Sequence, residues 1–173
     1  MNRKIALLGL AFTLVFTAAA AAQDPNFSGR WKMTSAKVEP EMENVIFPEI
    51  ALEIKHEGIH LTIITTVINS EINSPPTERR YTTDRKECLN PSKGSGDLKS
   101  VAYLENGILI IEGEAEATMV KSSEGAEPEI SYVRIQSHEE FSLSADQKTL
   151  TVVRKTDSSI GPTTRTTTLT KIS

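Results

Sequence analysis

The stretch Asn26-Phe27-Ser28-Gly29-Arg30-Trp31 opens the first folded segment of this 173-residue chain and follows directly on a hydrophobic leader. Beyond it, short runs of alternating apolar and polar residues are separated by turn signals, and no convincing long helical pattern interrupts them. Alternation with a period of two places one face of each run against a core, which is typical of half-buried β-strands. The sequence therefore predicts an all-β fold.

The first 22 residues have the three-part order of a secretory signal peptide. Arg3 and Lys4 precede an apolar run over 5–16, and small residues fill 18–22. The alternative is a membrane anchor, but the apolar run is short for a span of about 20 residues, and the alanines suit cleavage better. We expect residues 1–22 to be removed. Residues 23–173 then form a periplasmic or extracellular protein with no membrane span after cleavage.

Composition limits the classes of partner. Without the two basic residues of the leader, 17 basic residues stand against 23 acidic ones, a net charge of −6. A chain this acidic lacks the basic surface that nucleic acid requires, so no nucleic-acid partner is expected. The remaining 151 residues suit one domain. Cys88 is the only cysteine, so it is a buried apolar residue, a dimer staple or a reactive thiol.

Turn signals divide the mature chain into about nine strands. Asn106-Gly107 is the strongest of these signals, because both residues accept the positive φ of a tight hairpin turn. We expect a single antiparallel β-barrel of about 8–10 strands, since closure satisfies strand edges that otherwise aggregate. The predicted strands cover residues 29–38, 51–56, 59–69, 78–83, 97–105, 108–120, 130–143, 149–156 and 163–172.

The alternation also assigns residues to the interior. A two-residue turn at Glu57-Gly58 sets two apolar faces against each other. They are Leu52, Ile54 and His56 on one strand and Ile59, Leu61 and Ile63 on the next.

After Asn106-Gly107, glutamates at 112, 114 and 116 point outward and mostly small residues point inward. In the same hairpin Lys99 is expected opposite Glu114. Small inward residues mean either close packing, the commoner case, or space left inside the barrel. The inward set is Ile111, Gly113, Ala115, Ala117 and Met119.

Two charged residues fall on an apolar face near the C-terminus. If Leu143 pairs with Leu150, then Glu139 pairs with Arg154, and both point inward. One interpretation is a rim salt bridge, or a bulge that turns Glu139 outward, as is common where barrels bend. The other is an inward ion pair that orients a polar group of a ligand.

The segment Phe27-Ser28-Gly29-Arg30-Trp31 resembles the lipocalin and wider calycin group, in which Gly-x-Trp opens the first strand. Residues 141–152 and 81–88 are similar to small exported bacterial proteins of this lipocalin-like kind. The resemblance implies that Gly29 and Trp31 are structural and that the indole closes one end of the barrel. It also implies that a basic residue of the last strand covers the indole. Arg165 is the first candidate for that residue and Lys171 the second.

No catalytic or metal-binding pattern stands out. His56 and His60 are predicted on opposite faces of a hairpin, and His138 is distant in sequence, so no metal and no cofactor are expected. No nucleophile elbow or triad is recognisable, so an enzyme ranks last. A transmembrane barrel is disfavoured, because acidic residues occupy outward positions where it needs an apolar band.

The expected function is non-catalytic binding of a small, mostly apolar ligand in the mouth of an exported barrel. The alternative is a barrel with a filled core that acts through its surface or with the cell envelope, with an unknown protein partner. Cavity volume discriminates the two. The candidate lining residues are Leu52, Ile54, Leu61, Ile63, Ile111, Gly113, Ala115 and Ala117.

The leader generates a direct prediction. We expect exported protein to begin at or within two residues of Gln23, because a signal peptidase cuts after small residues such as Ala22. N-terminal sequencing checks this, and protein that still begins at Met1 after export contradicts it.

Overall fold

A computed structural model describes residues 25–41, 47–68, 74–91, 97–121, 129–159 and 161–172. The predicted leader lies outside these residues. The described residues form ten antiparallel strands and no helix. The strands are β1 (Gly29–Glu39), β2 (Glu49–Glu57), β3 (His60–Ile68), β4 (Thr77–Thr82), β5 (Cys88–Asn90), β6 (Leu98–Glu105), β7 (Ile108–Lys121), β8 (Glu129–Leu143), β9 (Thr149–Asp157) and β10 (Thr163–Lys171).

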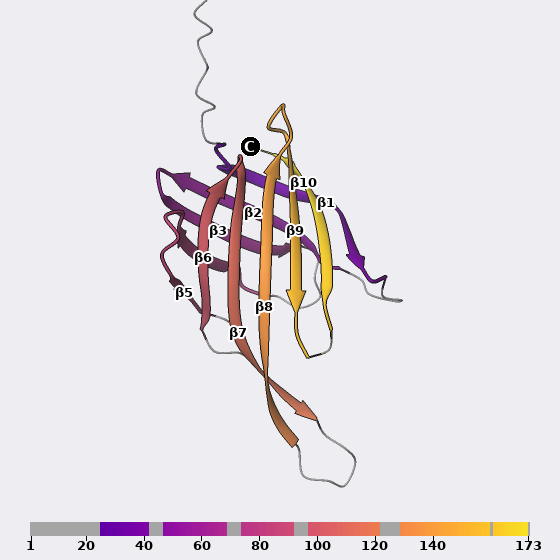
Figure 1. Cartoon of the computed structure of the whole chain (residues 1–173). Helices are drawn as coiled ribbons and strands as arrows, with labels where there is room; N and C mark the ends of the chain where they lie inside the picture. The colour runs from indigo at the N-terminus through magenta and orange to yellow at the C-terminus, as the bar shows by residue number, and fades with distance from the viewer. Residues whose placement is uncertain are drawn as a thin grey trace, which may run out of the picture.

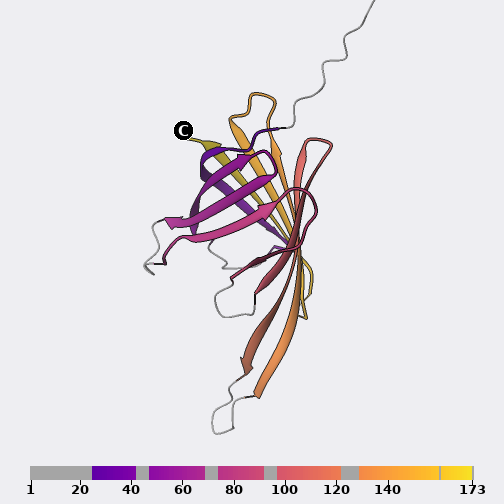
Figure 2. The same ribbon diagram turned by 90° about the vertical axis from the view of Figure 1, so that its left-hand side faces the viewer.

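The strands form one strongly curved sheet in the order β4-β3-β2-β1-β10-β9-β8-β7-β6-β5. Figures 1 and 2 show β1 to β4 crossing behind the long strands β6 to β10, so that the two halves enclose an interior. The all-β, nearly closed barrel is confirmed. The short strand β5 was missed, because three residues are too few for alternation to show.

Turn chemistry sets the hairpins. At the β6–β7 turn, Asn106 and Gly107 have φ of 51° and 79°, and Lys99 pairs with Glu114, as predicted. The β2–β3 turn was placed one residue too early. Gly58 has φ of 59°, so the turn centres on Gly58 and Ile59, and Glu57 pairs with His60. Ile59 is therefore 47% exposed in the turn rather than inside the barrel.

The core lies at one end of the barrel around Trp31, which is completely buried. Its indole Nε1 donates a hydrogen bond to the carbonyl of Phe27 at 3.1 Å. The buried side chains packed with it include Phe27, Leu52, Ile54, Leu61, Leu109, Phe141, Leu150 and Leu169.

The residue that covers Trp31 is Lys171, and the expectation for Arg165 was wrong. The Nζ of Lys171 lies 5.2 Å from the centre of the indole ring, and the two residues are paired between β1 and β10. Arg165 pairs instead with Val38. Six residues of extended strand separate Arg165 from Lys171, roughly 20 Å, so the Arg165 side chain is too far away to cover Trp31.

The hairpin of β7 and β8 extends past its neighbours. Pairing of β6 with β7 begins at Glu114, and pairing of β9 with β8 ends at Gln136. Residues 115–121 and 129–135 therefore pair only with each other, as the ribbon that projects from the barrel in Figures 1 and 2.

A side chain joins the two edges of the sheet. Asn90 of β5 is buried, accepts a hydrogen bond from the backbone nitrogen of Arg80 at 2.7 Å and donates to its carbonyl at 3.0 Å. The Asn90 side-chain amide thus makes the two hydrogen bonds with β4 that the backbone of a neighbouring strand would otherwise make. Cys88 lies at the same junction, half-buried, with its sulfur 3.8 Å from the hydroxyl of Thr82.

The Asn90 contact predicts a graded loss of stability. Asn90→Leu removes both hydrogen bonds and leaves the part-buried backbone nitrogen and carbonyl of Arg80 without these partners, which lowers the free energy of unfolding by about 2 kcal/mol. Asn90→Asp places a carboxylate oxygen against the Arg80 carbonyl at a buried position, so we expect a larger loss at neutral pH. Urea unfolding measures both variants, and equal stability of Asn90→Leu and wild type contradicts the assignment.

Candidate functional site

A cavity of about 220 Å³ lies inside the barrel. Its walls come from both halves of the sheet: β2, β3 and β4 on one side and β7 to β10 on the other. Most of the lining is apolar, because the inward positions of these strands carry aliphatic and aromatic residues. The apolar lining consists of Ile50, Leu52, Ile63, Ile111, Phe141, Val152 and Leu169.

A row of three charged side chains crosses this apolar wall. The predicted register is confirmed, because Leu143 pairs with Leu150 and Glu139 with Arg154, and Arg154 pairs in turn with Arg165. Arg154 Nη2 donates to Glu139 Oε1 at 2.6 Å. The Glu139 side chain is only 11% exposed, and all three residues line the cavity. No bulge turns Glu139 outward.

A second arginine approaches Glu139 from the opposite wall. Arg79 of β4 lies with its Nη1 4.0 Å from Glu139 Oε1, a looser ion pair than that of Arg154. Its strand neighbour Tyr81 is buried against the same cavity. Burial, followed by the charge of Glu139, raises the pKa of Tyr81 to about 12, so the phenol stays protonated and is a hydrogen-bond donor at neutral pH.

Arg165 of β10 lines the same cavity. Its Nε and Nη2 atoms are buried and have no hydrogen-bond partner among the described residues. The guanidinium carbon lies 4.8 Å from the ring centre of Phe47. Desolvation, and then repulsion from Arg154, lower the pKa of Arg165. A buried guanidinium without an acceptor is costly, and an anion placed against it relieves that cost.

Only some of the predicted lining residues line the cavity. Leu52, Ile63 and Ile111 do so, whereas Ile54 and Leu61 are buried in the core around Trp31 and are not among its lining residues.

The small residues of β7 open no space in this cavity. A Cβ at Gly113 would lie 3.0 Å from the hydroxyl of Ser137, which is close packing. Ala115 and Ala117 belong to the projecting ribbon and do not line the cavity.

Sequence reasoning missed Arg79, Tyr81 and the two buried Arg165 nitrogens that lack an acceptor. Arg79 and Tyr81 had a signal in the sequence. They are two residues apart on the predicted strand 78–83, so they share a face, and the aromatic ring of Tyr81 suggests that this face points inward. Pairing within β8–β9 was predictable from a hairpin turn. The meeting of β4 with β8 across the barrel depends on closure, for which no local signal exists.

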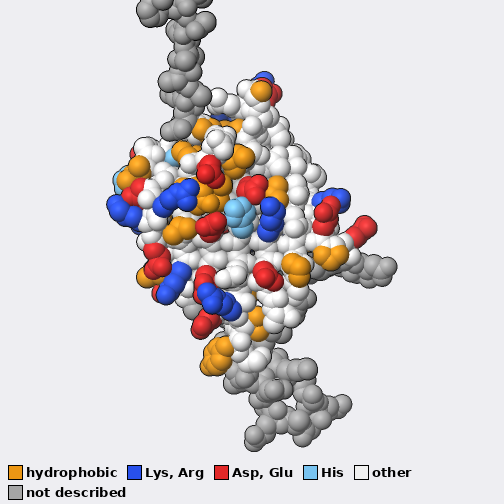
Figure 3. Space-filling view, viewed as in Figure 1, with side chains coloured by type: hydrophobic (Ala, Val, Ile, Leu, Met, Phe, Trp, Pro, Cys, Tyr) orange, Lys and Arg blue, Asp and Glu red, His pale blue; other side chains and the backbone are white. Residues whose placement is uncertain are grey.

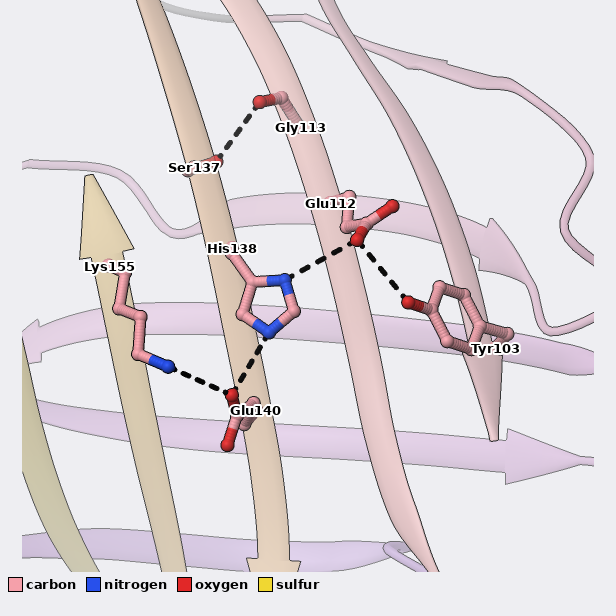
Figure 4. A network of polar contacts seen from close by, with 7 residues as sticks. All are labelled: Tyr103, Glu112, Gly113, Ser137, His138, Glu140 and Lys155. Atoms are coloured by element: carbon pink, nitrogen blue, oxygen red, sulfur yellow. Dashed lines mark hydrogen bonds and ion pairs between the residues drawn. The ribbon is translucent and has the colours of Figure 1, made fainter. Parts of the chain in front are cut away.

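The outer face carries a different polar cluster. His138 lies between two carboxylates, with Nδ1 3.4 Å from Glu112 and Nε2 3.0 Å from Glu140. Lys155 and Tyr103 extend this network, as Figure 4 shows. Figure 3 shows acidic, basic and histidine side chains mixed across this face. Glu112, His138 and Lys155 also line an open hollow of about 610 Å³, together with Gly113. Because the charges in the network are paired with one another, the interior cavity is the stronger candidate site.

Metal ligands and membrane-spanning helices do not occur in the described residues. No group of three or more histidine, cysteine, aspartate or glutamate side chains there is placed to hold a metal ion. No described helix is long and apolar enough to cross a membrane.

No protein-family model and no curated protein matches the sequence. Solved structures do match the fold. A zebrafish ileal bile acid-binding protein complexed with cholic acid superposes with a TM-score of 0.56 at 17% identity, over 84% of this chain and 98% of that one. A point mutant of the REP1-NXSQ fatty acid transporter has a TM-score of 0.53 at 12% identity, over 84% and 98%. Lipid binding protein 8 of Caenorhabditis elegans, without ligand, has a TM-score of 0.52 at 15% identity, over 84% and 94%.

These comparisons show the architecture: the chain has the same kind of antiparallel β-barrel as these three proteins. At such low identity they show the fold alone. The residues of the cavity carry the argument about what the barrel holds.

The inward ion pair predicts an asymmetric mutational response. Glu139→Gln leaves three guanidiniums in the cavity without a counterion, and we expect a loss of about 1–3 kcal/mol in the free energy of unfolding. The loss stays in this range because 39% of the Arg154 side chain is accessible. The double variant Glu139→Gln/Arg154→Met removes charge from both sides and should recover part of that stability. Thermal unfolding compares the two, and a less stable double variant contradicts the account.

Proposed function

We propose that the barrel is a non-catalytic binding protein for one small, mostly apolar molecule with an acidic group. The observation that carries this proposal is the pair of buried Arg165 nitrogens, Nε and Nη2, that have no hydrogen-bond acceptor among the described residues and lie in a cavity with aliphatic and aromatic walls. The apolar body of the ligand packs against residues such as Leu52, Ile63 and Phe141, and its acid accepts hydrogen bonds from Arg165. The structural neighbours, named for bile acid, fatty acid and lipid, support the same class of ligand.

The cavity also limits ligand size. A volume of 220 Å³ is below the roughly 300–1,000 Å³ of pockets for drug-sized ligands. The ligand is therefore a short-chain or single-ring acid, unless the barrel widens on binding. The cavity and the two buried Arg165 nitrogens without an acceptor support this proposal over the filled-core alternative.

We also propose that binding takes place after export, in the periplasm or outside the cell. The support is the order of basic, apolar and small residues over 1–22. Protein purified without its leader is therefore the form to be assayed.

Isothermal titration calorimetry with octanoate and octanol tests the proposed ligand class. We expect wild type to bind octanoate about tenfold or more tightly than octanol, because a hydrogen bond to a charged group contributes about 1.5–3 kcal/mol. Arg165→Met should remove this preference and keep binding of the alcohol. Arg134→Met is the matched control, because Arg134 pairs with Glu114 on the exposed ribbon. Equal affinity of wild type for acid and alcohol rejects the acidic group.

A further inference from the structure

Arg154 and Arg165 lie directly opposite each other on neighbouring inward-facing strands. They are register partners between β9 and β10, and both line the cavity. Like charges at directly opposed positions of a sheet repel each other, and both side chains of this pair are partly shielded from bulk water. The same repulsion contributes to the lowered pKa of Arg165. An acceptor between the two guanidiniums relieves the repulsion.

Glu139 accepts a hydrogen bond from Arg154, and no acceptor is present for the Nε and Nη2 atoms of Arg165 among the described residues. The Glu139 Oε1 accepts from Arg154 Nη2, whereas a guanidinium has five N–H donors in a planar fork. The Nε and Nη2 atoms of Arg165 therefore remain for a bound group, beside the partly accessible guanidinium of Arg154.

The charge of the cavity lining is not balanced. Arg79, Arg154 and Arg165 contribute three positive charges and Glu139 one negative charge, and the phenol of Tyr81 is neutral. The lining thus carries a net charge of +2. A carboxylate neutralises only half of it.

We infer that the acidic group of the ligand is a dianionic oxyanion of the phosphate-monoester class, bound between Arg154 and Arg165. This inference rests on the proposed function and specifies the ligand further. A phosphate monoester has three terminal oxygens and carries close to two negative charges above its second pKa of about 6. Those oxygens accept from two guanidinium forks at once, whereas a carboxylate matches the fork of one arginine.

Four probes with matched eight-carbon bodies separate charge from shape. Octyl phosphate is a tetrahedral dianion at pH 8, octyl sulfate a tetrahedral monoanion and octanoate a planar monoanion. Octanedioate carries two charges at separate ends. By calorimetry at pH 8 we expect octyl phosphate to bind wild type about tenfold or more tightly than each of the other three, because charge-assisted hydrogen bonds are roughly twice as strong as neutral ones.

Two variants assign the preference to this site. Arg165→Met should bring the affinities for octyl phosphate and octyl sulfate to within about threefold of each other, since the second fork is gone. Glu139→Gln frees Arg154 and raises the charge of the lining, so octyl phosphate should bind it more tightly than it binds wild type. Arg134→Met, outside the cavity, should behave as wild type. Thermal unfolding with saturating octyl phosphate verifies that each variant is folded.

The outcomes are distinguishable from failure of the proposed function. Equal binding of octyl phosphate and octyl sulfate, with octanoate still preferred over octanol, overturns the dianion and leaves the acidic ligand standing. Tighter binding of octanedioate than of octyl phosphate places the two charges on separate groups and also overturns it. Weaker binding of octyl phosphate to Glu139→Gln than to wild type contradicts the site. Binding of none of the octyl probes overturns this inference and the proposed function together.

Discussion

Charge buried inside the barrel is the constraint on which this account depends. Three guanidiniums and one carboxylate line a small cavity whose remaining walls are mostly aliphatic and aromatic, where an unpaired charge is more costly than at the surface. Glu139 holds the arrangement together, because it accepts from Arg154 on the next strand and lies 4.0 Å from Arg79 on the opposite wall. Arg165 is left with the aromatic ring of Phe47 and no described acceptor for its Nε and Nη2 atoms. The chain thus maintains, at some expense of stability, a positive centre whose natural complement is an anion.

The barrel positions this cluster of charged residues, because it fixes how neighbouring strands are aligned. Alternation sends every second residue inward, so one register places Glu139, Arg154 and Arg165 side by side. Closure then brings Arg79 across from β4. That closure relies on the side chain of Asn90, which stands in for a neighbouring strand between the two sheet edges. Trp31, covered by Lys171, fills the core at one end, so the free volume lies beyond that core.

Sequence patterns predicted what local chemistry determines. Positive φ at Asn106-Gly107 set one hairpin, and alignment of Leu143 with Leu150 set the Glu139–Arg154 pair. Patterns were less successful wherever distant segments meet. Lys171 rather than Arg165 covers Trp31, because β1 and β10 are separated by most of the chain and no turn fixes their register. Ala115 and Ala117 lie on the projecting ribbon, because β6 and β9 end before they reach those positions. Arg79 enters the site only through closure.

Native mass spectrometry of the protein purified from its own source tests the central claim most directly, since it detects whatever the barrel carries. The account predicts one small acidic molecule bound to wild type, released on denaturation and detected as an anion. It also predicts loss of that molecule from Arg165→Met and its retention in Arg134→Met. A neutral molecule retained equally by wild type and Arg165→Met, or wild type isolated consistently without any bound molecule, would contradict the account.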